Sequence, residues 1–399
     1  MKVLNTDQKN NVLCEMIDIL GKRREEIIAV NKQDLDSFDP TDRAMYDRLV
    51  IDDYKIDGMI AAVTEVKGQE DPIGKVRFEH LHENGMKILN KTAPFGTIMI
   101  IYESRPDVTI EAAVVAFKSS NKILLKGGKE AIRSNEMLVE CWHQALATQG
   151  LAKDWITLIK TNRIETQEFL SNPPVPVDLI VPRGGEGLIA FVKKHAKCAV
   201  LISGRGNNFL YADKSCDWEQ TKRIILSSKI QKISACNALD KVLIHEELPD
   251  LSDRIMELYQ VFKDAGVEVV IHESLKGYLP DVQIMESEAV WGEEFLAMKI
   301  CIGLESNISS SIERINTYSG GHSATIMSEN IKDVEEFMEQ VDGAAVYHNA
   351  STRFTDGGQL GVGAELAIST DKLHHRGPLG LDQLVTNKWY IYGQGQIRQ

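Results

Sequence analysis

One cysteine stands where a nucleophile would be useful. Cys236 lies among small and polar residues, in the run Ser-Ala-Cys-Asn-Ala, and an apolar stretch typical of a strand follows at residues 241–245. A thiol on a turn that leads into a strand is held rigidly and stays within reach of a substrate. The alternative is a buried structural cysteine, because the local spacing fixes no histidine or asparagine partner.

Two glycine pairs follow predicted strands and open predicted helices, so their amides and the helix dipoles could hold a phosphate. Neither pair matches GxGxxG, so the usual Rossmann fingerprint is absent, and a tight turn without any ligand is the alternative. The candidate cofactor residues at these turns are Lys126, Gly127, Gly128, Lys129, Arg183, Gly184 and Gly185.

A late loop, residues 349–358, is rich in small residues and hydrogen-bond donors. Arg353 in this loop could form a fork with a carboxylate or a phosphate, and an interdomain salt bridge is the alternative. We predict substrate contacts from this loop, from the cysteine turn and from the segment after residue 102. The predicted substrate-binding residues are Ser104, Arg105, Asn237, Asn349, Arg353 and Asp356.

Composition limits the function classes. With 399 residues the chain can form two or three domains, and its net charge of −13 argues against a nucleic-acid partner. It contains no apolar stretch of the roughly 18 residues that a membrane span needs, and its start lacks the apolar core of a signal peptide. We therefore expect a cytoplasmic protein. Six cysteines without a CxxC pair, and scattered histidines, predict reduced thiols and no metal site.

The order of the patterns predicts an α/β fold. The first seventy residues are mostly helical, and an Asn-Gly turn at residues 84–85 predicts a hairpin. From residue 95 to 211 strands alternate with helices, and a second such series follows Cys236. This alternation implies parallel sheets covered on both faces. An apolar tail, residues 388–392, is expected to pair with the hairpin.

Five stretches together carry a family resemblance. They are IIYESRPDVT (100–109), ILLKGGKEAIRSN (123–135), VPRGGEGLI (181–189), SACNALD (234–240) and VYHNASTRFTDGGQLGVGAELAISTDKLHHRGPLGL (346–381). In this order they resemble the γ-glutamyl phosphate reductase family, a branch of the aldehyde dehydrogenase superfamily.

The resemblance implies a fold of three parts. An NADP-binding domain would comprise residues 1–73 and 94–228, and a catalytic domain with the nucleophilic cysteine would comprise residues 229–380. The hairpin and the C-terminal strand, residues 74–93 and 381–399, would form an oligomerisation unit. A homo-oligomer, dimer or tetramer, is therefore expected.

The resemblance also implies roles for single residues. Cys236 corresponds to the catalytic cysteine, Lys126 to a lysine that contacts the adenosine ribose, and Glu294-Phe295 to the pair at the nicotinamide-side ribose. Lys129 occupies a position that is often acidic in NAD-preferring members, so it favours the 2′-phosphate of NADPH. The implied reaction is the NADPH-dependent reduction of L-glutamyl 5-phosphate through a cysteine thioester, the second step of proline biosynthesis.

Some positions depart from the superfamily pattern. Leu201 stands where hydrolytic aldehyde dehydrogenases carry a glutamate, and Ser104 falls near the position of their oxyanion-binding asparagine. An ordinary aldehyde dehydrogenase and a catalytically silent binding protein of the same fold are the alternative functions. Glutamate 5-kinase is a candidate partner, which would deliver the unstable substrate.

Overall fold

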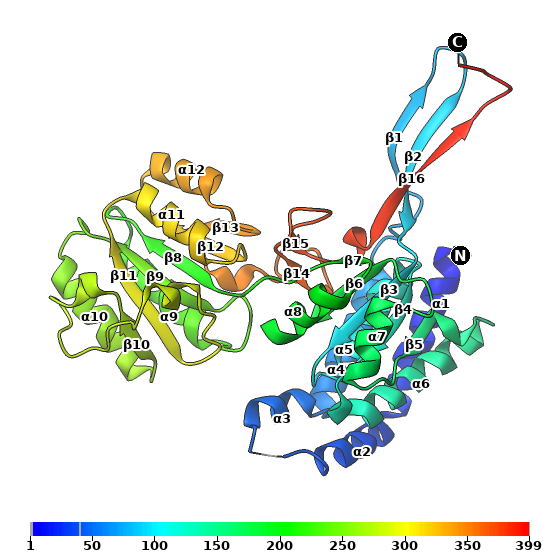
Figure 1. Cartoon of the computed structure of the whole chain (residues 1–399), viewed down its shortest axis with the longest axis horizontal. Helices are drawn as coiled ribbons and strands as arrows, with labels where there is room; N and C mark the ends of the chain where they lie inside the picture. The colour runs from blue at the N-terminus through cyan, green and yellow to red at the C-terminus, as the bar shows by residue number, and fades with distance from the viewer. Residues whose placement is uncertain (1–2, 40, 399) are drawn as a thin grey trace. The chain divides into compact units, whose positions relative to one another are not determined.

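Strands and helices alternate twice along the chain, and each series forms its own parallel sheet (Figure 1). The computed structural model describes residues 3–39 and 41–398, so residues 1, 2, 40 and 399 of the expected domain ranges lie outside it. Unit 1 comprises the described residues up to Ile202, with Gly361–Ala367 and the described residues from Leu379 onward. Unit 2 comprises Ser203–Leu360 and Ile368–Pro378. The predicted α/β class with parallel sheets is confirmed.

The main sheet of unit 1 is parallel, in the order β5-β4-β3-β6-β7. Its strands are β3 (Thr97–Tyr102), β4 (Lys122–Lys126), β5 (Ile156–Leu158), β6 (Leu179–Arg183) and β7 (Ala199–Val200). Neighbouring residues of β3 enter different cores, Ile100 one and Ile101 the other. Both faces of the sheet are therefore covered, as is usual for a parallel sheet.

Helices supply these two covers. They are α1 (Thr6–Lys22), α2 (Arg24–Leu35), α3 (Arg43–Leu49), α4 (Asp53–Gly68), α5 (Val108–Lys118), α6 (Ile132–Thr148), α7 (Arg163–Ser171) and α8 (Glu186–His195). The residues of α5 are buried throughout except Glu111, which explains why its sequence is apolar on every side.

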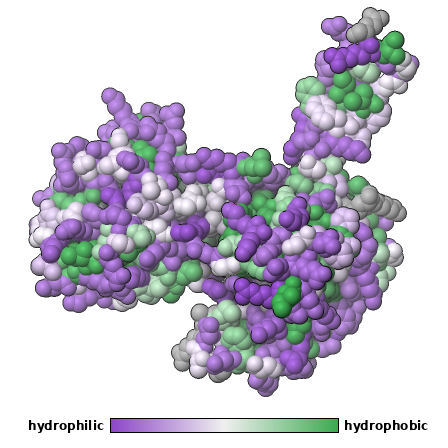
Figure 2. Space-filling view, viewed as in Figure 1, coloured by the Kyte–Doolittle hydropathy of each residue, from purple (hydrophilic) through white to green (hydrophobic). Residues whose placement is uncertain are grey.

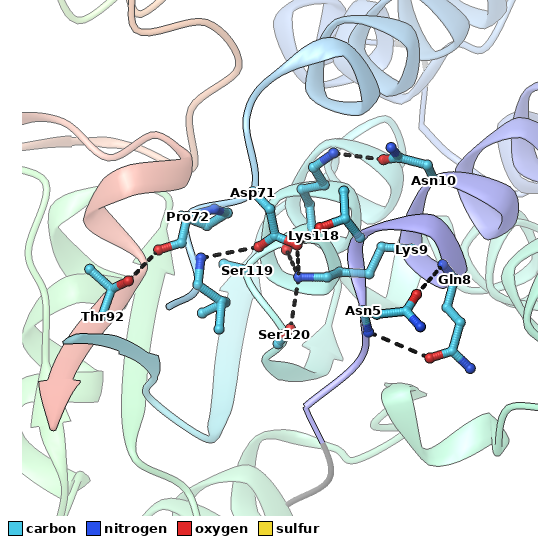
Figure 3. A network of polar contacts seen from close by, with 12 residues as sticks. Asn5, Gln8, Lys9, Asn10, Asp71, Pro72, Thr92, Lys118, Ser119 and Ser120 are labelled. Carbon is cyan, nitrogen blue, oxygen red and sulfur yellow. Dashed lines mark hydrogen bonds and ion pairs between the residues drawn. The ribbon is translucent and has the colours of Figure 1, made fainter. Parts of the chain in front are cut away.

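A buried ion pair fastens the segment before the hairpin to α1 (Figure 3). Lys9 is fully buried, and its Nζ lies 2.6 Å from Asp71 Oδ2. The same ammonium donates to Lys118 O and Ser120 Oγ, each at 3.0 Å. Burial lowers the pKa of Lys9, and the hydrogen bond and charge of Asp71 oppose that shift. The ammonium thus depends on Asp71 for its only acidic partner among the residues described.

A small antiparallel sheet joins β1 (Val76–Leu81), β2 (Lys87–Pro94) and β16 (Val385–Tyr392). The predicted hairpin and its C-terminal partner strand are confirmed, and Gly85 at the tip has φ 86°, which favours glycine. The sheet groups with unit 1 instead of forming a compact unit of its own. Phe78 and Trp389 are half exposed, and their ring centroids lie 5.7 Å apart. Figure 2 shows hydrophobic patches between hydrophilic surface on this sheet.

The sheet of unit 2 is also parallel, in the order β10-β11-β9-β8-β12-β13. Its strands are β8 (Asn208–Ala212), β9 (Leu239–His245), β10 (Glu268–Ile271), β11 (Lys299–Glu305), β12 (Ser323–Met327) and β13 (Ala345–His348). The helices are α9 (Trp218–Ile230), α10 (Leu251–Asp264), α11 (Ile308–Tyr318) and α12 (Ile331–Gln340). α9 and α10 share one core with Leu210, and α11 and α12 share the other with Tyr211.

The expected boundary after residue 228 needs correction. β8 is buried at every position and pairs in parallel with both β9 and β12, so residues 203–228 belong to unit 2. The end of the expected catalytic domain also differs, because Gly361–Ala367 packs in the core of unit 1. The segment Ile368–Pro378, which contains β14 (Ile368–Ser369) and β15 (Gly377–Pro378), returns to unit 2.

Among the described residues, every helix is too short or too polar to cross a membrane.

The ion pair of Lys9 predicts unequal effects of two substitutions. Asp71→Ala should lower the free energy of unfolding by about 3–5 kcal/mol, because it leaves a buried ammonium without its counter-charge. Lys9→Met removes the charge and keeps most of the volume, so its loss should be clearly smaller. Urea unfolding followed by circular dichroism measures both values. Equal losses for the two variants would contradict this account of the pair.

Candidate active site

Cys236 lies on a turn directly before β9, as predicted, and is half-buried. Behind the turn, the buried Asn208 at the start of β8 donates through Nδ2 to three backbone carbonyls. Its acceptors are Gly206 O at 3.0 Å, Cys236 O at 2.8 Å and Ala238 O at 2.7 Å. One side chain therefore ties the carbonyls of Cys236 and Ala238 to the segment of Gly206, while Cys236 itself remains partly accessible.

Gly206 allows the cysteine turn to approach this closely. A Cβ at this position would lie 2.1 Å from Cys236 O and 2.5 Å from Cys236 Cα, so any side chain would displace the turn. Sequence reasoning missed both Gly206 and Asn208. The signal that could have found them is the run Gly206-Asn207-Asn208 directly ahead of an apolar strand.

The loop at residues 349–358 is bonded to the cysteine turn through Asn237. Asn237 Nδ2 donates to Arg353 O at 3.2 Å and to Thr355 O at 2.9 Å, and Thr352 Oγ1 donates to Asn237 O at 2.9 Å. The structure thus brings together two predicted substrate residues, Asn237 and Arg353. Arg353 Nε and Nη1 are buried and have no hydrogen-bond partner among the described residues. Buried guanidinium donors without a partner are costly, which suits a site for an anionic ligand.

Asn349 and Asp356 have local partners instead. Asn349 Oδ1 accepts from Ser328 N at 3.0 Å, and Asp356 Oδ1 accepts from Gly358 N at 3.0 Å. Asn349 has φ 49°, a left-handed conformation that asparagine tolerates. Both side chains therefore shape the loop, and their predicted contact with substrate stays a prediction.

Two other cysteines are poor nucleophiles because they are buried. Cys301 is fully buried in β11, and burial raises its pKa to about 12. Burial also raises the pKa of Cys141 to about 11. At neutral pH both are almost entirely thiols, and a thiolate is the reactive form.

The Glu294-Phe295 pair follows a short 3₁₀ helix at Glu288–Gly292 in unit 2. Phe295 N donates to Asp240 Oδ2 at 2.8 Å, and the Phe295 ring lies under Lys241, with Nζ 3.5 Å from the ring centroid. Asp240 and Lys241 belong to β9. The strand that follows the cysteine turn therefore also anchors the pair predicted to meet a ribose.

The first glycine turn lies between β4 and α6 in unit 1. Lys126 ends β4, its Nζ donates to Gly127 O at 2.9 Å, and burial lowers its pKa. A Cβ at Gly127 would lie 2.2 Å from Asn135 Nδ2, a buried nitrogen that has no partner among the described residues. The turn is therefore closely packed and needs glycine.

The second glycine turn lies between β6 and α8. Gly185 N, which the sequence suggested for a phosphate, donates to Glu103 Oε2 at 3.2 Å. A Cβ at Gly184 would lie 2.6 Å from Glu103 Cδ. The carboxylate of Glu103 thus already lies at the N-terminus of α8, where the helix dipole favours a negative charge. Glu103 was missed from the sequence, although a polar residue directly after a parallel strand is a usual site residue. Arg183 Nη1 donates to Leu366 O within unit 1.

The segment after β3 holds two further predicted residues. Ser104 is buried and donates through N and Oγ to Glu130 Oε1 at 3.1 and 2.5 Å. Arg105 Nη2 lies 3.2 Å from Asp107 Oδ2. Burial opposes ionisation of Asp107, but the charges of Arg105 and Lys55 outweigh it and hold the pKa of this carboxyl below its ordinary value. Ser104 and Arg105 are therefore fixed from within unit 1.

Comparison with known proteins gives close relatives over the whole chain. A scan against protein-family models gave no match. The chain is 40% identical over 398 residues to the gamma-glutamyl phosphate reductase of Clostridium beijerinckii, covering 99% of this chain and 95% of the relative. The crystal structure of gamma-glutamyl phosphate reductase from Thermotoga maritima superposes with a TM-score of 0.94 at 38% identity, over 99% of this chain and 95% of that one.

A more distant structure shares the fold. An acetylating aldehyde dehydrogenase from Geobacillus thermoglucosidasius is 15% identical, with a TM-score of 0.69 over 99% of this chain and 94% of its own. The predicted aldehyde dehydrogenase-like fold is therefore confirmed.

Proposed function

Because this chain belongs to the gamma-glutamyl phosphate reductase family, we propose that it reduces L-glutamyl 5-phosphate to L-glutamate 5-semialdehyde and phosphate. This reaction is the second step of proline biosynthesis. The chain is an oxidoreductase with a small-molecule substrate and a nicotinamide cofactor, for which we propose NADPH. The observation that carries the proposal is Cys236, a half-buried thiol on a turn fixed by Asn208 and bonded to the loop of Arg353.

Cys236 acts as the nucleophile. Its thiolate attacks the acyl carbon, and the bond from that carbon to the phosphate oxygen breaks. Inorganic phosphate departs, and the acyl group remains on Cys236 as a thioester. NADPH, when bound, would supply the hydride that adds to the acyl carbon. The C–S bond then breaks, which releases the aldehyde and returns the thiolate of Cys236. A thioester accepts hydride far better than a carboxylate does, which is the physical reason for passing through the cysteine. Because Asn208 and Gly206 fix the main chain of the turn, the sulfur needs little rearrangement to reach the acyl carbon.

Arg353 binds an anionic part of the substrate. Its backbone is bonded to Asn237, the residue next to the nucleophile, and two of its buried nitrogens lack a protein acceptor in the part of the chain that the structure describes. A phosphate or carboxylate would satisfy those donors in a charge-assisted fork. Asn237, Asn349, Asp356, Ser104 and Arg105 complete the proposed set of substrate residues.

The residues at the glycine turns suit a dinucleotide. The close packing at Gly127 and Gly184 requires glycine at both turns, and the buried Asn135 Nδ2 beside Gly127 lacks an acceptor in the described structure. Lys129 lines a cavity of about 430 Å³ in unit 1. The residues proposed to hold NADPH are Lys126, Gly127, Gly128, Lys129, Arg183, Gly184, Gly185, Glu294 and Phe295.

The small sheet supports assembly. β1 is exposed along its whole length, and large apolar side chains on β1 and β16 are half exposed or more. A sheet edge with such a surface is a ready site for another chain. We therefore assign it to contacts in a homo-oligomer, a dimer or tetramer. Glutamate 5-kinase is the natural source of the acyl phosphate and a proposed transient partner.

Substitution of the nucleophile tests the proposed function. Cys236→Ala should abolish NADPH oxidation with glutamyl phosphate generated in place by a kinase, and should leave nucleotide affinity and the melting temperature nearly unchanged. Without NADPH, mass spectrometry should find an acyl adduct on the wild type and on the control Cys301→Ala, but not on Cys236→Ala. Retention of most turnover by Cys236→Ala would assign the nucleophile elsewhere.

Cofactor preference tests the role of Lys129. One charge-assisted hydrogen bond contributes about 1.5–3 kcal/mol, so Lys129→Glu should lower the preference for NADPH over NADH by about ten- to a hundredfold. The ratio of kcat/KM for the two cofactors measures this. Arg133→Gln serves as the comparison, because Arg133 lines the same cavity but pairs with Asp34 at 3.3 Å. If the ratio of kcat/KM values stayed unchanged in Lys129→Glu but changed in Arg133→Gln, recognition of the 2′-phosphate would be assigned to Arg133.

A further inference from the structure

A cluster of lysines surrounds the ring of Phe295 in unit 2. The Nζ atoms of Lys241, Lys299 and Lys229 lie 3.5, 5.4 and 6.0 Å from the ring centroid. Lys229 and Lys241 are fully buried, although lysine is among the residues least often buried. Such burial needs a compensating set of contacts, and Phe295 and its neighbours provide them.

Hydrogen bonds with Lys241 and its neighbour Asp240 hold the main chain on both sides of Glu294. Lys241 Nζ donates to Glu293 O at 2.7 Å, and Phe295 N donates to Asp240 Oδ2 at 2.8 Å. Asp240 Oδ1 accepts from Lys229 Nζ at 2.8 Å, so the carboxylate is itself fixed. Two adjacent residues of β9 are thus hydrogen-bonded to the residues that precede and follow Glu294.

The contact between Lys241 and Phe295 depends on charge. An ammonium is attracted to the face of an aromatic ring, and the attraction is strongest where water is excluded. A neutral amine could still donate to Glu293 O but would lose the attraction to the ring. The attraction that holds the Phe295 ring in place should therefore weaken when Lys241 loses its proton.

We propose that Lys241 is a positioning residue for the cofactor, holding Phe295 and the main chain around Glu294 in the arrangement that binds the ribose of a nicotinamide nucleotide. This inference rests on the proposed function and adds a residue to it. It predicts that nucleotide affinity depends on the charge of a side chain that does not itself touch the nucleotide.

The charge of Lys241 changes within an accessible pH range. Burial lowers its pKa to about 8, against the opposing charge of Asp240. The other groups that face it are Cys301 of β11, Lys229 of α9 and Glu293. Lys241 is therefore a cation below about pH 8 and neutral above it, and nucleotide affinity should fall as the pH rises through that value.

Stability should respond in the opposite direction. The pKa of Lys241 is lower in the folded chain than its ordinary value of 10.5. The unfolded chain then binds more protons between about pH 8 and 10.5, so this group makes folding more favourable as the pH rises. A loss of nucleotide affinity above pH 8 that came from this lysine would therefore not be accompanied by a loss of stability from the same group.

Direct binding tests the proposal. Titration of NADPH fluorescence should give a roughly tenfold higher Kd for Lys241→Met than for wild type at pH 7. Between pH 7 and 9.5 the Kd of wild type should rise to the value of Lys241→Met, whose own Kd should stay flat. At pH 8.5 binding to wild type should take up protons, measured by calorimetry in two buffers, and binding to Lys241→Met should not.

Lys299→Met is the matched control, because it removes the same charge from a partly exposed lysine that pairs with Glu268 at 3.0 Å. Because its ammonium lies 5.4 Å from the ring centroid and is partly exposed, its Kd should stay much closer to wild type than that of Lys241→Met and should keep the wild-type rise with pH. Phe295→Leu provides a second variant if Lys241→Met does not fold, and it should also abolish the pH dependence. Wild-type affinity that is flat from pH 7 to 9.5, or Lys241→Met that binds like wild type, would overturn the proposal. Failure of every variant and of wild type to bind NADPH would instead refute the proposed cofactor.

Discussion

The turn of Cys236 depends on a single buried amide. Asn208 Nδ2 bonds to the carbonyls of Gly206, Cys236 and Ala238, and an interior carbonyl without a donor would carry a desolvation penalty. This bond set requires β8 beside β9 in one sheet, and it requires a glycine at position 206. The pairing register of β8 and β9 therefore also determines where the nucleophile lies.

Both units also use buried lysines to join distant parts of the chain. In unit 1, Lys9 links α1 to the segment before the hairpin, and Lys118 donates to Asn10 Oδ1 at 2.7 Å and to Lys67 O at 3.0 Å. In unit 2, Lys241 links β9 to the residues around Glu294. Lys9 and Lys118 have two or more acceptors each, and Lys241 has Glu293 O together with the face of the Phe295 ring. These contacts offset the cost of removing each ammonium from water. The same device thus fixes the approach to the small sheet and the proposed ribose-binding segment.

Local patterns predicted much of this architecture, because strand and helix periodicity and the Asn84-Gly85 turn are properties of neighbouring residues. They could not decide which sheet receives β8, since a strand that is buried throughout has no polar face to show its neighbours. The crossing of Gly361–Ala367 into unit 1 is likewise set by contacts with residues far away in the sequence.

The candidate site also contains some residues that the sequence could identify and others that it could not. Family resemblance pointed to Cys236, Lys126 and the Glu294-Phe295 pair, and the Arg353 loop stood out by its donors. The residues that hold these groups in place, such as Asn208, Glu103 and Lys241, were missed because their roles depend on partners distant in sequence. Lysine in particular is read from sequence as a surface residue.

The central claim is that the acyl group on Cys236 is exchanged with phosphate and not with water. Hydrolytic aldehyde dehydrogenases use a carboxylate base, which contributes about 10²–10⁴-fold. The sequence resemblance assigns Leu201 to that position in this chain, and Leu201 is buried in the core of unit 1. The reverse reaction with NADP⁺ and glutamate 5-semialdehyde tests the claim most directly. NADPH should form only when inorganic phosphate is added, at a rate that saturates with phosphate. Formation of NADPH at the full rate in phosphate-free buffer would contradict the account and would assign the chain an aldehyde-oxidising activity.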